Sequence, residues 1–470
     1  MSMIHSYLGG KGYTILKKEL SREQLEEIKK ELIAKPIVVN NCGPQNKQNT
    51  FPIYRESLNK IYVPRYYGIK KFNKPKENKL SDGETIHPEF IGSLRPIQIP
   101  VVDAFMKNIN EGKGGGLLEL PCAFGKTVLS LYIYSLLKVK TLIIVHKEFL
   151  LNQWIERIQQ FLPNTRIGRI QGQIIDIENK DIVMGMLQSL SMKEYPSSLF
   201  NSFGLTIIDE VHHISSEVFS CALFKIVTKY MLGLSATMNR KDGTTNVFKM
   251  FLGDVVFKGK REEEHNVTVK AMEYICDDPE FNEVKTDYRG NIMYSTMISK
   301  LCTYNRRTEF ILDIITKSFE ENENQQMMIL AHNKNILKYL FDAISYRNIA
   351  EGSVGYYIGG MKETALKETE SKKIVIATYS MAAEALDIKS LTTLLMATPK
   401  TDIEQAVGRI LREKHGNPVV IDIIDQHQPF RNQWKKRKTF YKKQNYQIVY
   451  PNKKKDVEEE EIFVGKCLLK

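Results

Sequence analysis

The chain has 470 residues, of which 42% are hydrophobic and 26% are charged, a balance typical of a globular protein and unlike that of a disordered one. Its formal net charge of +12 favours a polyanionic partner but is too mild over this length to establish one. The sequence contains neither a run of about 18 apolar residues nor the apolar core of a secretory signal. We therefore expect neither a membrane-spanning nor a secreted protein.

The cysteines are scattered along the chain, and no two of them form a CxxC pair. This spacing disfavours a zinc site and fits reduced thiols in an intracellular protein. The six are Cys42, Cys122, Cys221, Cys276, Cys302 and Cys467.

Residues 1–85 form the first predicted domain, a small accessory module. A helix is predicted from Ser21 to Ala34, because Ser21 can serve as its N-cap and Gln24, three residues later, completes a capping box. A stretch rich in Tyr, Pro and Lys follows, and a turn-like Ser-Asp-Gly at 81–83 comes near the end of the module.

Two series of short apolar runs, alternating with amphipathic stretches, fill the middle of the chain. The first spans 86–258 and the second 266–428, with a charged linker at 259–265 between them. Apolar runs of four to six residues are typical of parallel strands buried on both faces, and the helical stretches between them predict βαβ crossovers. We expect an α/β fold with two tandem doubly wound parallel sheets, followed by a basic extension at 429–470.

The strongest local motif is a Gly-Lys-Thr between a predicted strand and a predicted helix, within residues 121–127. At such a turn, backbone N–H groups and the helix N-terminus point at phosphate oxygens. Lys126 would reach the β- and γ-phosphates of a nucleotide, and the Thr127 hydroxyl would bind Mg²⁺. Leu120 stands where the strict pattern has its first glycine, so a chance Gly-Lys-Thr at a tight turn is the alternative.

Two adjacent carboxylates end an apolar strand within LTIIDEVHH, residues 205–213. Strand ends of this kind bring side chains to the carboxyl edge of a parallel sheet, beside the phosphate loop. Asp209 would hold the metal ion, and Glu210 would polarise the attacking water. The alternative is a solvated turn, which becomes improbable when a phosphate loop precedes it by 83 residues (209 − 126).

Two further motifs complete the set. Ser235 and Thr237, in a Ser-Ala-Thr that follows another predicted strand, could bond to the carboxylate pair and relay the state of the nucleotide. QAVGRILR in the second series places Arg409 and Arg412 three residues apart, where they could bind a γ-phosphate together with Gln405. A helix cap and an ordinary charged surface helix are the respective alternatives.

The four motifs, their order and their placement at strand ends resemble the superfamily 2 helicases of the DExH type. The resemblance spans residues 90–428 and is strongest to the branch that contains the XPB-type repair and transcription helicases and the poxvirus transcript-release helicase. It implies two RecA-like domains with ATP and Mg²⁺ bound between them.

The same resemblance implies roles for further residues. Gln98 would read the adenine edge, and the eight loop positions from Leu120 to Thr127 would surround the phosphates, with Ala123 in place of a usual glycine. The cofactor-binding set is then Gln98, Leu120, Pro121, Cys122, Ala123, Phe124, Gly125, Lys126 and Thr127. The implied nucleic-acid contacts are His146, Gln188, Arg240 and Thr378, and the implied coupling residues are Ser235, Thr237, His212 and Asp387. Met238 and Ala385 depart from the pattern, where proline and glycine are usual.

The resemblance implies an ATP-dependent DNA helicase or translocase of 3′ to 5′ polarity, acting as a monomer in viral or cellular transcription or in repair. An RNA helicase is the first alternative, because no motif reads a 2′-hydroxyl. A catalytically inactive scaffold is the second, although Lys126, Glu210 and Arg412 are all present. If the chain is viral, its compartment would be the cytoplasmic factory or the virion; otherwise it would be the nucleus.

The segment from Arg431 to Lys455 holds ten Lys or Arg residues and neither Asp nor Glu. Basic residues interleaved with rings suit a nucleic-acid surface, where lysines neutralise phosphates and rings stack on bases. A helix that packs its rings on the second sheet and leaves its lysines in water is the alternative. The rings favour packing and the charges favour nucleic acid. The rings are Trp434, Phe440, Tyr441, Tyr446 and Tyr450.

Overall fold

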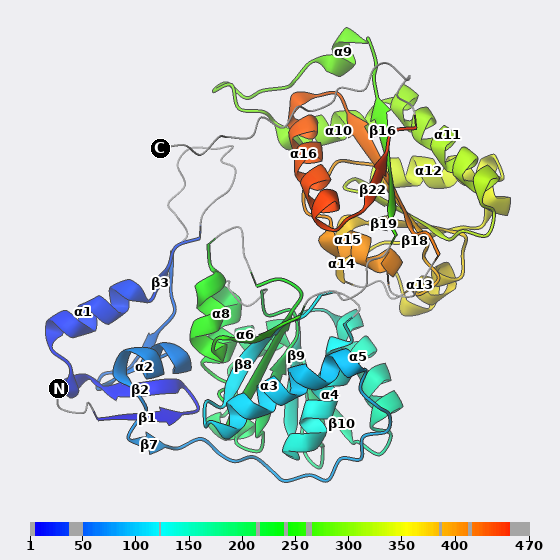
Figure 1. Ribbon diagram of the computed structural model, residues 1–470. Coiled ribbons are helices and arrows are strands. Elements are labelled where there is room, and N and C mark those ends of the chain that lie inside the picture. The colour runs from blue at the N-terminus through cyan, green and yellow to red at the C-terminus, as the bar shows by residue number, and fades with distance from the viewer. Residues whose placement is uncertain are drawn as a thin grey trace, which may run out of the picture. The chain divides into compact units, whose positions relative to one another are not determined.

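The computed structural model divides into two compact units, Met1–Glu262 and Glu263–Lys470, which are described separately (Figure 1). The residues that it describes are 5–36, 50–121, 124–212, 217–238, 243–259, 266–384, 388–411 and 416–451. Within them, every helix is too short or too polar to cross a membrane. The division into five parts expected from the sequence stays a prediction, and most of its linker, residues 260–265, lies outside the described ranges.

Unit 1 begins with a small sheet of strand order β5-β6-β2-β1-β7 and two helices. Its helix α1 has the predicted capping box, in which the Ser21 side chain accepts from the Gln24 N–H group. The predicted end of this helix was wrong, because α1 stops at Glu31 and the next residues form strand β3, paired with β4. The elements are β1 (Ser6–Gly9), β2 (Gly12–Leu16), α1 (Arg22–Glu31), β3 (Ile33–Ala34), β4 (Phe51–Pro52), β5 (Arg55–Glu56), β6 (Lys60–Val63), α2 (Arg65–Phe72) and β7 (Glu77–Asn78).

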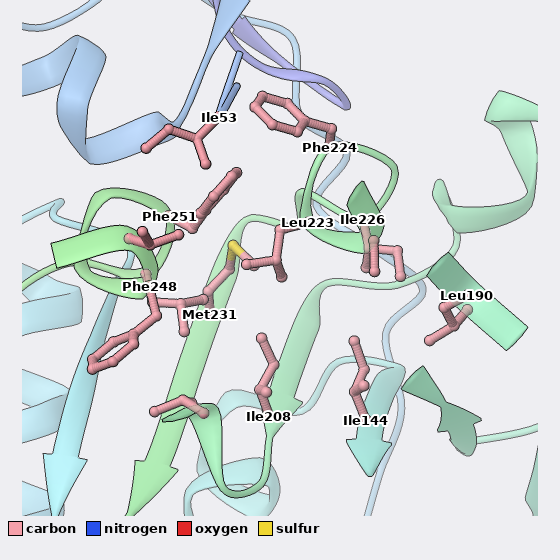
Figure 2. Close-up of a cluster of buried hydrophobic side chains, with 14 of the residues drawn as sticks. Ile53, Ile144, Leu190, Ile208, Leu223, Phe224, Ile226, Met231, Phe248 and Phe251 are labelled. Carbon is pink, nitrogen blue, oxygen red and sulfur yellow. The ribbon is translucent and has the colours of Figure 1, made fainter. Parts of the chain in front are cut away.

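This module packs on the rest of unit 1 through a shared apolar core (Figure 2). Ile53 of the module lies in the same buried cluster as Phe224 and Phe251. At its edge, the buried guanidinium of Arg65 donates to the carbonyls of Thr228 and Lys229 at 3.2 and 3.1 Å. The shared apolar cluster and the hydrogen bonds of the buried Arg65 guanidinium attach the module to the rest of unit 1.

The main sheet of unit 1 has eight strands in the order β11-β10-β12-β9-β13-β14-β8-β15, and all neighbours are parallel except β10 and β11. Helices cover both faces: Ile143 of β9 belongs to an apolar cluster with residues of α3, α4 and α5, whereas Ile144 belongs to a cluster with residues of α6, α7 and α8. The strands are β8 (Gly115–Glu119), β9 (Thr141–Val145), β10 (Ile167–Gln171), β11 (Ile174–Asp176), β12 (Ile182–Met186), β13 (Leu205–Ile208), β14 (Tyr230–Ser235) and β15 (Val255–Lys258), and the helices are α3 (Ile99–Asn110), α4 (Lys126–Leu137), α5 (Glu148–Phe161), α6 (Leu187–Met192), α7 (Glu217–Leu223) and α8 (Thr245–Leu252).

Unit 2 is built on a seven-stranded sheet of order β18-β19-β17-β20-β21-β16-β22, in which every pair is parallel. The predicted α/β fold class with two parallel sheets is therefore confirmed. The strands are β16 (Thr268–Tyr274), β17 (Met327–Ala331), β18 (Val354–Tyr357), β19 (Ile374–Thr378), β20 (Thr393–Met396), β21 (Val419–Asp425) and β22 (Gln447–Val449), and the helices are α9 (Pro279–Asn282), α10 (Tyr294–Thr303), α11 (Asn305–Glu321), α12 (Lys334–Tyr346), α13 (Glu363–Glu370), α14 (Tyr379–Glu384), α15 (Glu404–Val407) and α16 (Gln428–Lys443).

The first part of the basic extension completes this second sheet. Helix α16 buries Trp434 and Tyr441, and β22 then pairs with β16. Arg437 is also buried: its Nε and Nη2 each lie 2.8 Å from a carboxylate oxygen of Asp422, which accepts a further hydrogen bond from the Tyr441 hydroxyl at 2.9 Å. Trp434, Tyr441 and one of the cations of this helix thus belong to the core, whereas Phe440 is only partly buried.

Replacing Arg437 by methionine should destabilise the protein by about 3–5 kcal/mol, because it leaves the Asp422 carboxylate buried without its cation. Urea denaturation followed by fluorescence measures the change. The exposed neighbour Lys436 is the control, and its methionine variant should stay within about 0.5 kcal/mol of the wild type. Equal midpoints for the two variants would contradict the role given to the buried pair.

Candidate nucleotide-hydrolysis site

The predicted site residues of unit 1 gather at the carboxyl edge of its main sheet. The phosphate loop follows β8, Asp209 follows β13, and Ser235 ends β14, which lies between those two strands. Short apolar strands with polar residues directly after them force this grouping, since parallel strands end at one edge of the sheet. The structure therefore brings together groups that are more than 100 residues apart in the sequence.

The phosphate loop leads directly into helix α4, which begins at Lys126. Gly125 is its N-cap and adopts φ +82°, where a Cβ atom would lie 2.5 Å from the Gln98 side chain, so glycine is required here. Leu120 is buried, and its N–H group donates to the Ser235 carbonyl at 2.9 Å. Leucine thus stands at the start of the loop as a core residue, while Cys122 and Ala123 lie outside the described residues.

Gln98 touches the phosphate loop rather than solvent. Its Nε2 donates to the carbonyl of Phe124 at 2.9 Å, and its Oε1 accepts from the N–H group of Arg95 at 2.9 Å. The Arg95 guanidinium donates to the same Phe124 carbonyl. The recognition of adenine by Gln98 stays a prediction. The hydrogen bonds from Gln98 and Arg95 to the Phe124 carbonyl, which fix the loop, were not expected from the sequence.

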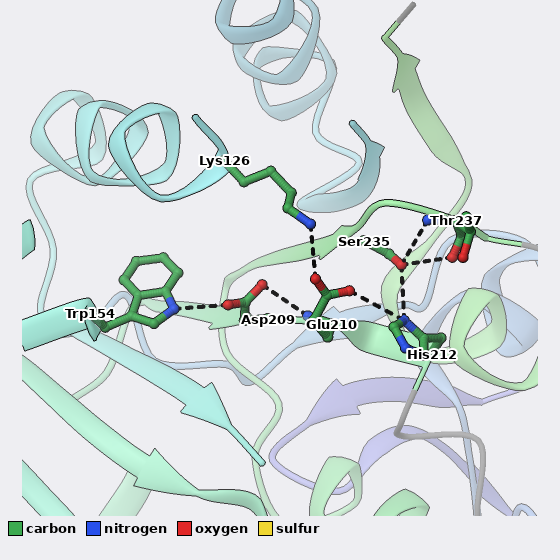
Figure 3. A network of polar contacts seen from close by, with 7 residues as sticks. All are labelled: Lys126, Trp154, Asp209, Glu210, His212, Ser235 and Thr237. Atoms are coloured by element: carbon green, nitrogen blue, oxygen red, sulfur yellow. Dashed lines mark hydrogen bonds and ion pairs between the residues drawn. The ribbon is translucent and has the colours of Figure 1, made fainter. Parts of the chain in front are cut away.

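Lys126 and Glu210 face each other across the site (Figure 3). The distance from Lys126 Nζ to Glu210 Oε1 is 3.0 Å, and both side chains are more than four-fifths buried. Glu210 has φ +49°, a left-handed conformation that costs a non-glycine residue about 1–2 kcal/mol. That conformation turns the chain sharply after β13. A phosphate oxygen that entered the loop would compete with the Glu210 carboxylate for the Lys126 ammonium.

The Asp209 carboxylate is held from two sides. The indole Nε1 of Trp154 donates to Oδ2 at 2.9 Å, and the backbone N–H of Glu210 donates to Oδ1 at 3.0 Å. Burial raises the pKa of Asp209 above its ordinary value, as does the charge of Glu210, while Lys126 and the indole hydrogen bond oppose the rise. A cation bound there would reverse this balance and stabilise the carboxylate.

A polar chain leads from Glu210 to the end of β14. Glu210 Oε2 lies 3.4 Å from His212 Nδ1, and that nitrogen lies 3.1 Å from Ser235 Oγ. The Ser235 hydroxyl donates to the Thr237 carbonyl at 2.7 Å. The three predicted coupling residues of unit 1 are thus joined to the carboxylate pair in one network, shown in Figure 3.

The donors near the phosphate loop suit a hard divalent cation. Thr127 in the first turn of α4 and Asp209 after β13 offer a hydroxyl and a carboxylate oxygen, the ligand types that Mg²⁺ takes beside phosphate oxygens. Among the described residues there is no cluster of three or more His, Cys, Asp or Glu side chains that would hold a metal by itself. This set fits a Mg²⁺ that arrives with the nucleotide.

The remaining predicted residues divide between the two units. In unit 1, His146 follows β9 and Gln188 lies in α6, and the Gln188 amide donates to the His146 carbonyl at 2.7 Å. In unit 2, Thr378 ends β19 with its hydroxyl 3.2 Å from Ser380 Oγ. Gln405 lies in α15, and Arg409 is buried in the turn after it. Arg240, Asp387 and Arg412 lie outside the described residues.

Two residues of the site were not identified from the sequence: Trp154 and Arg95. Trp154 is spaced four residues from Leu150 and from Ile158, a pattern that indicates only a buried helix face. No local pattern predicts that its N–H group reaches a carboxylate 55 residues away.

Comparisons with known proteins find one matching family model and relatives that are named as helicases. Residues 91–240 match the family model described as the res subunit of type III restriction enzymes. The chain is 37% identical over 447 residues to a protein of Acanthamoeba polyphaga mimivirus with the provisional name ATP-dependent RNA helicase L396, covering 93% of this chain and 85% of that one.

Two further relatives also come from large DNA viruses. A protein of African swine fever virus, provisionally named ATP-dependent RNA helicase QP509L, is 27% identical over 374 residues, covering 75% of this chain and 73% of its own. A protein of invertebrate iridescent virus 6, provisionally named helicase 161L, is 25% identical over 445 residues, covering 90% and 96%. Among solved structures, T4 UvsW aligns over 92% of this chain and 95% of its own at 18% identity, with a TM-score of 0.36 that adds nothing to the sequence matches.

Proposed function

The chain belongs to the superfamily 2 helicases of large DNA viruses, and we propose that it is an ATP-driven DNA translocase or helicase that acts in viral transcription or DNA repair. The observation that supports this most is the arrangement of Lys126, Glu210 and Asp209 around the phosphate loop. A viral origin makes the cytoplasmic factory or the virion the proposed compartment, and we propose that the protein acts as a monomer.

The proposed mechanism assigns one task to each side chain. The Lys126 ammonium offsets part of the charge on the β- and γ-phosphates. Thr127 and Asp209 would hold Mg²⁺, which would supply further positive charge beside those phosphates. Glu210 orients the attacking water and accepts its proton. When the γ-phosphate is lost, the contacts of Glu210 change, and the His212–Ser235–Thr237 network transmits that change to the residues after β14. The arginine-finger role that the resemblance implies for Arg409 and Arg412 stays a prediction, because Arg412 lies outside the described residues.

Stimulation of ATP hydrolysis by nucleic acid tests this proposal. We expect single-stranded DNA to raise the rate well above the rate without polynucleotide and above the rate with RNA of the same sequence. RNA helicase activity is the second candidate, favoured by the names of the mimivirus and African swine fever virus relatives. A preference for RNA would select it and leave the assigned residues in place, whereas no hydrolysis under any condition would contradict both.

Helix α16 supplies a candidate surface for the nucleic-acid backbone. Its 16 residues include seven Lys or Arg and neither Asp nor Glu. Arg437 is buried and paired with Asp422, so it is not available to bind DNA as the other basic residues of the segment are expected to do. The pairs Lys435–Lys436 and Lys442–Lys443 are exposed and lie two turns, or about 10.5 Å, apart along the helix. Lys442 and Lys443 also interact favourably with the negative end of the helix dipole, whereas Lys435 and Lys436 lie too far from the C-terminus to do so.

Removing either lysine pair by alanine substitution should flatten the salt dependence of nucleic-acid binding. Each lost phosphate contact reduces the slope of log K against log salt by about 0.7 for a single strand, so each double variant should lose about 1.4. Anisotropy of a fluorescein-labelled oligothymidylate measures the slope. Exposed Lys317 and Lys338 of the same unit form the control pair, and their double variant should keep the wild-type slope. An unchanged slope in both lysine-pair variants would leave α16 as a packing helix only.

A further inference from the structure

The indole of Trp154 is 1% exposed, and its N–H group, which can only donate, points at the Asp209 carboxylate. The distance from Nε1 to Oδ2 is 2.9 Å, that of a full hydrogen bond. Trp154 comes from α5, whereas Asp209 follows β13 (Figure 3). The bond therefore connects a helix on one face of the sheet to the carboxylate at its functional edge.

The two oxygens of this carboxylate have different donors. The indole occupies one side of Oδ2, and the N–H group of Glu210 occupies one side of Oδ1 at 3.0 Å. Because the two donors come from different elements, the carboxylate cannot rotate without breaking one of them. Each oxygen keeps a second lone pair, so the group remains able to bind a cation.

Packing alone does not account for a tryptophan at this position. The neighbouring residues on the same face of α5, Leu150 and Ile158, are aliphatic, and an aromatic ring without a polar atom would fill the same apolar core. A buried indole N–H group requires an acceptor. Here that acceptor is the one carboxylate that the mechanism assigns to the metal ion, rather than a carbonyl of the sheet.

We propose that Trp154 is a positioning residue for Asp209, which orients the carboxylate before Mg²⁺ and the nucleotide bind. The inference rests on the proposed function, because it takes Asp209 as the group that meets the cation. Outer partners of a metal-binding carboxylate commonly change metal affinity by about 10–100-fold when they are removed. A merely structural tryptophan would change the stability of the fold and leave the affinity for Mg²⁺ as it is.

The test measures binding rather than turnover. The wild type and Trp154→Phe are titrated with Mg²⁺ in the presence of a fluorescent ADP carrying a methylanthraniloyl group, and again with EDTA. We expect Trp154→Phe to need about 10–100-fold more Mg²⁺ for the same nucleotide binding and to match the wild type in EDTA. The chain has two tryptophans, so Trp434→Phe is the matched control and should bind as the wild type does.

A second measurement does not depend on the folding of Trp154→Phe. In the Trp434→Phe protein, Trp154 is the only indole, and its emission should shift when Mg²⁺ is added to the ADP-bound protein. Equal Mg²⁺ affinity in wild type and Trp154→Phe, or an emission that ignores Mg²⁺ while the nucleotide binds, would overturn the role given to Trp154. Absence of nucleotide binding by the wild type would instead overturn the proposed function on which it rests.

Discussion

Replacement of Lys126 by alanine is expected to abolish ATP hydrolysis, with or without nucleic acid. The side chain starts at the first residue of α4, so its ammonium and the helix N-terminus act on the same phosphates. The ammonium is four-fifths buried beside Glu210, where a charge interacts more strongly than it does in open water. Its loss therefore removes the cation that the γ-phosphate needs and also leaves the Glu210 carboxylate without its partner.

A phosphate-release assay with saturating ATP and single-stranded DNA measures this effect. Lys107 on α3 is an exposed lysine outside the site, and its alanine variant is the control for charge removal. We expect that control to hydrolyse ATP at the wild-type rate and Lys126→Ala to show no rate above the blank. A Lys126→Ala protein that keeps its turnover would show that the loop after β8 does not hold the phosphates.

The parts of the site that the sequence predicted are those encoded within a few residues. A strand that ends in Asp-Glu, or a turn that contains Gly-Lys-Thr, carries its own geometry, and parallel pairing then places the strand ends together. The two local signals predict that Lys126 and Glu210 lie at one edge of the sheet, whereas the strand order and the 3.0 Å contact between them come from the structure. For the same reason, the doubly wound sheets could be inferred from short apolar runs before any contact was known.

Contacts between distant side chains could not be predicted in this way. The capping box at the start of α1 depends on neighbouring residues and was predicted correctly. The end of α1 was not, because Ile33 and Ala34 pair with β4 instead of forming another helical turn. The pairing of Arg437 with Asp422 removes a cation that looked available for DNA. The bond from Trp154 to Asp209 likewise needs the three-dimensional path of α5.

Substitution of Glu210 by glutamine is expected to preserve ATP binding and slow hydrolysis by about three orders of magnitude, as with the loss of other parts of a phosphoryl-transfer site. The amide keeps the size of the side chain and an oxygen that can accept from Lys126, so the φ +49° turn and the phosphate loop should remain intact. What it loses is the charge that polarises water and accepts its proton. Binding and hydrolysis should therefore separate in this variant.

The same variant, Glu210→Gln, distinguishes two roles of this side chain, activating water and holding Lys126 in place. Glu210→Gln keeps a polar atom near His212, so the contacts that lead through His212 to Ser235 should remain. Single-turnover hydrolysis and binding of the fluorescent ADP give the two quantities in one preparation. Tight nucleotide binding with slow chemistry would identify Glu210 as the group that activates water. Equal losses of binding and rate would mean that its main task is to hold Lys126 and the loop in place.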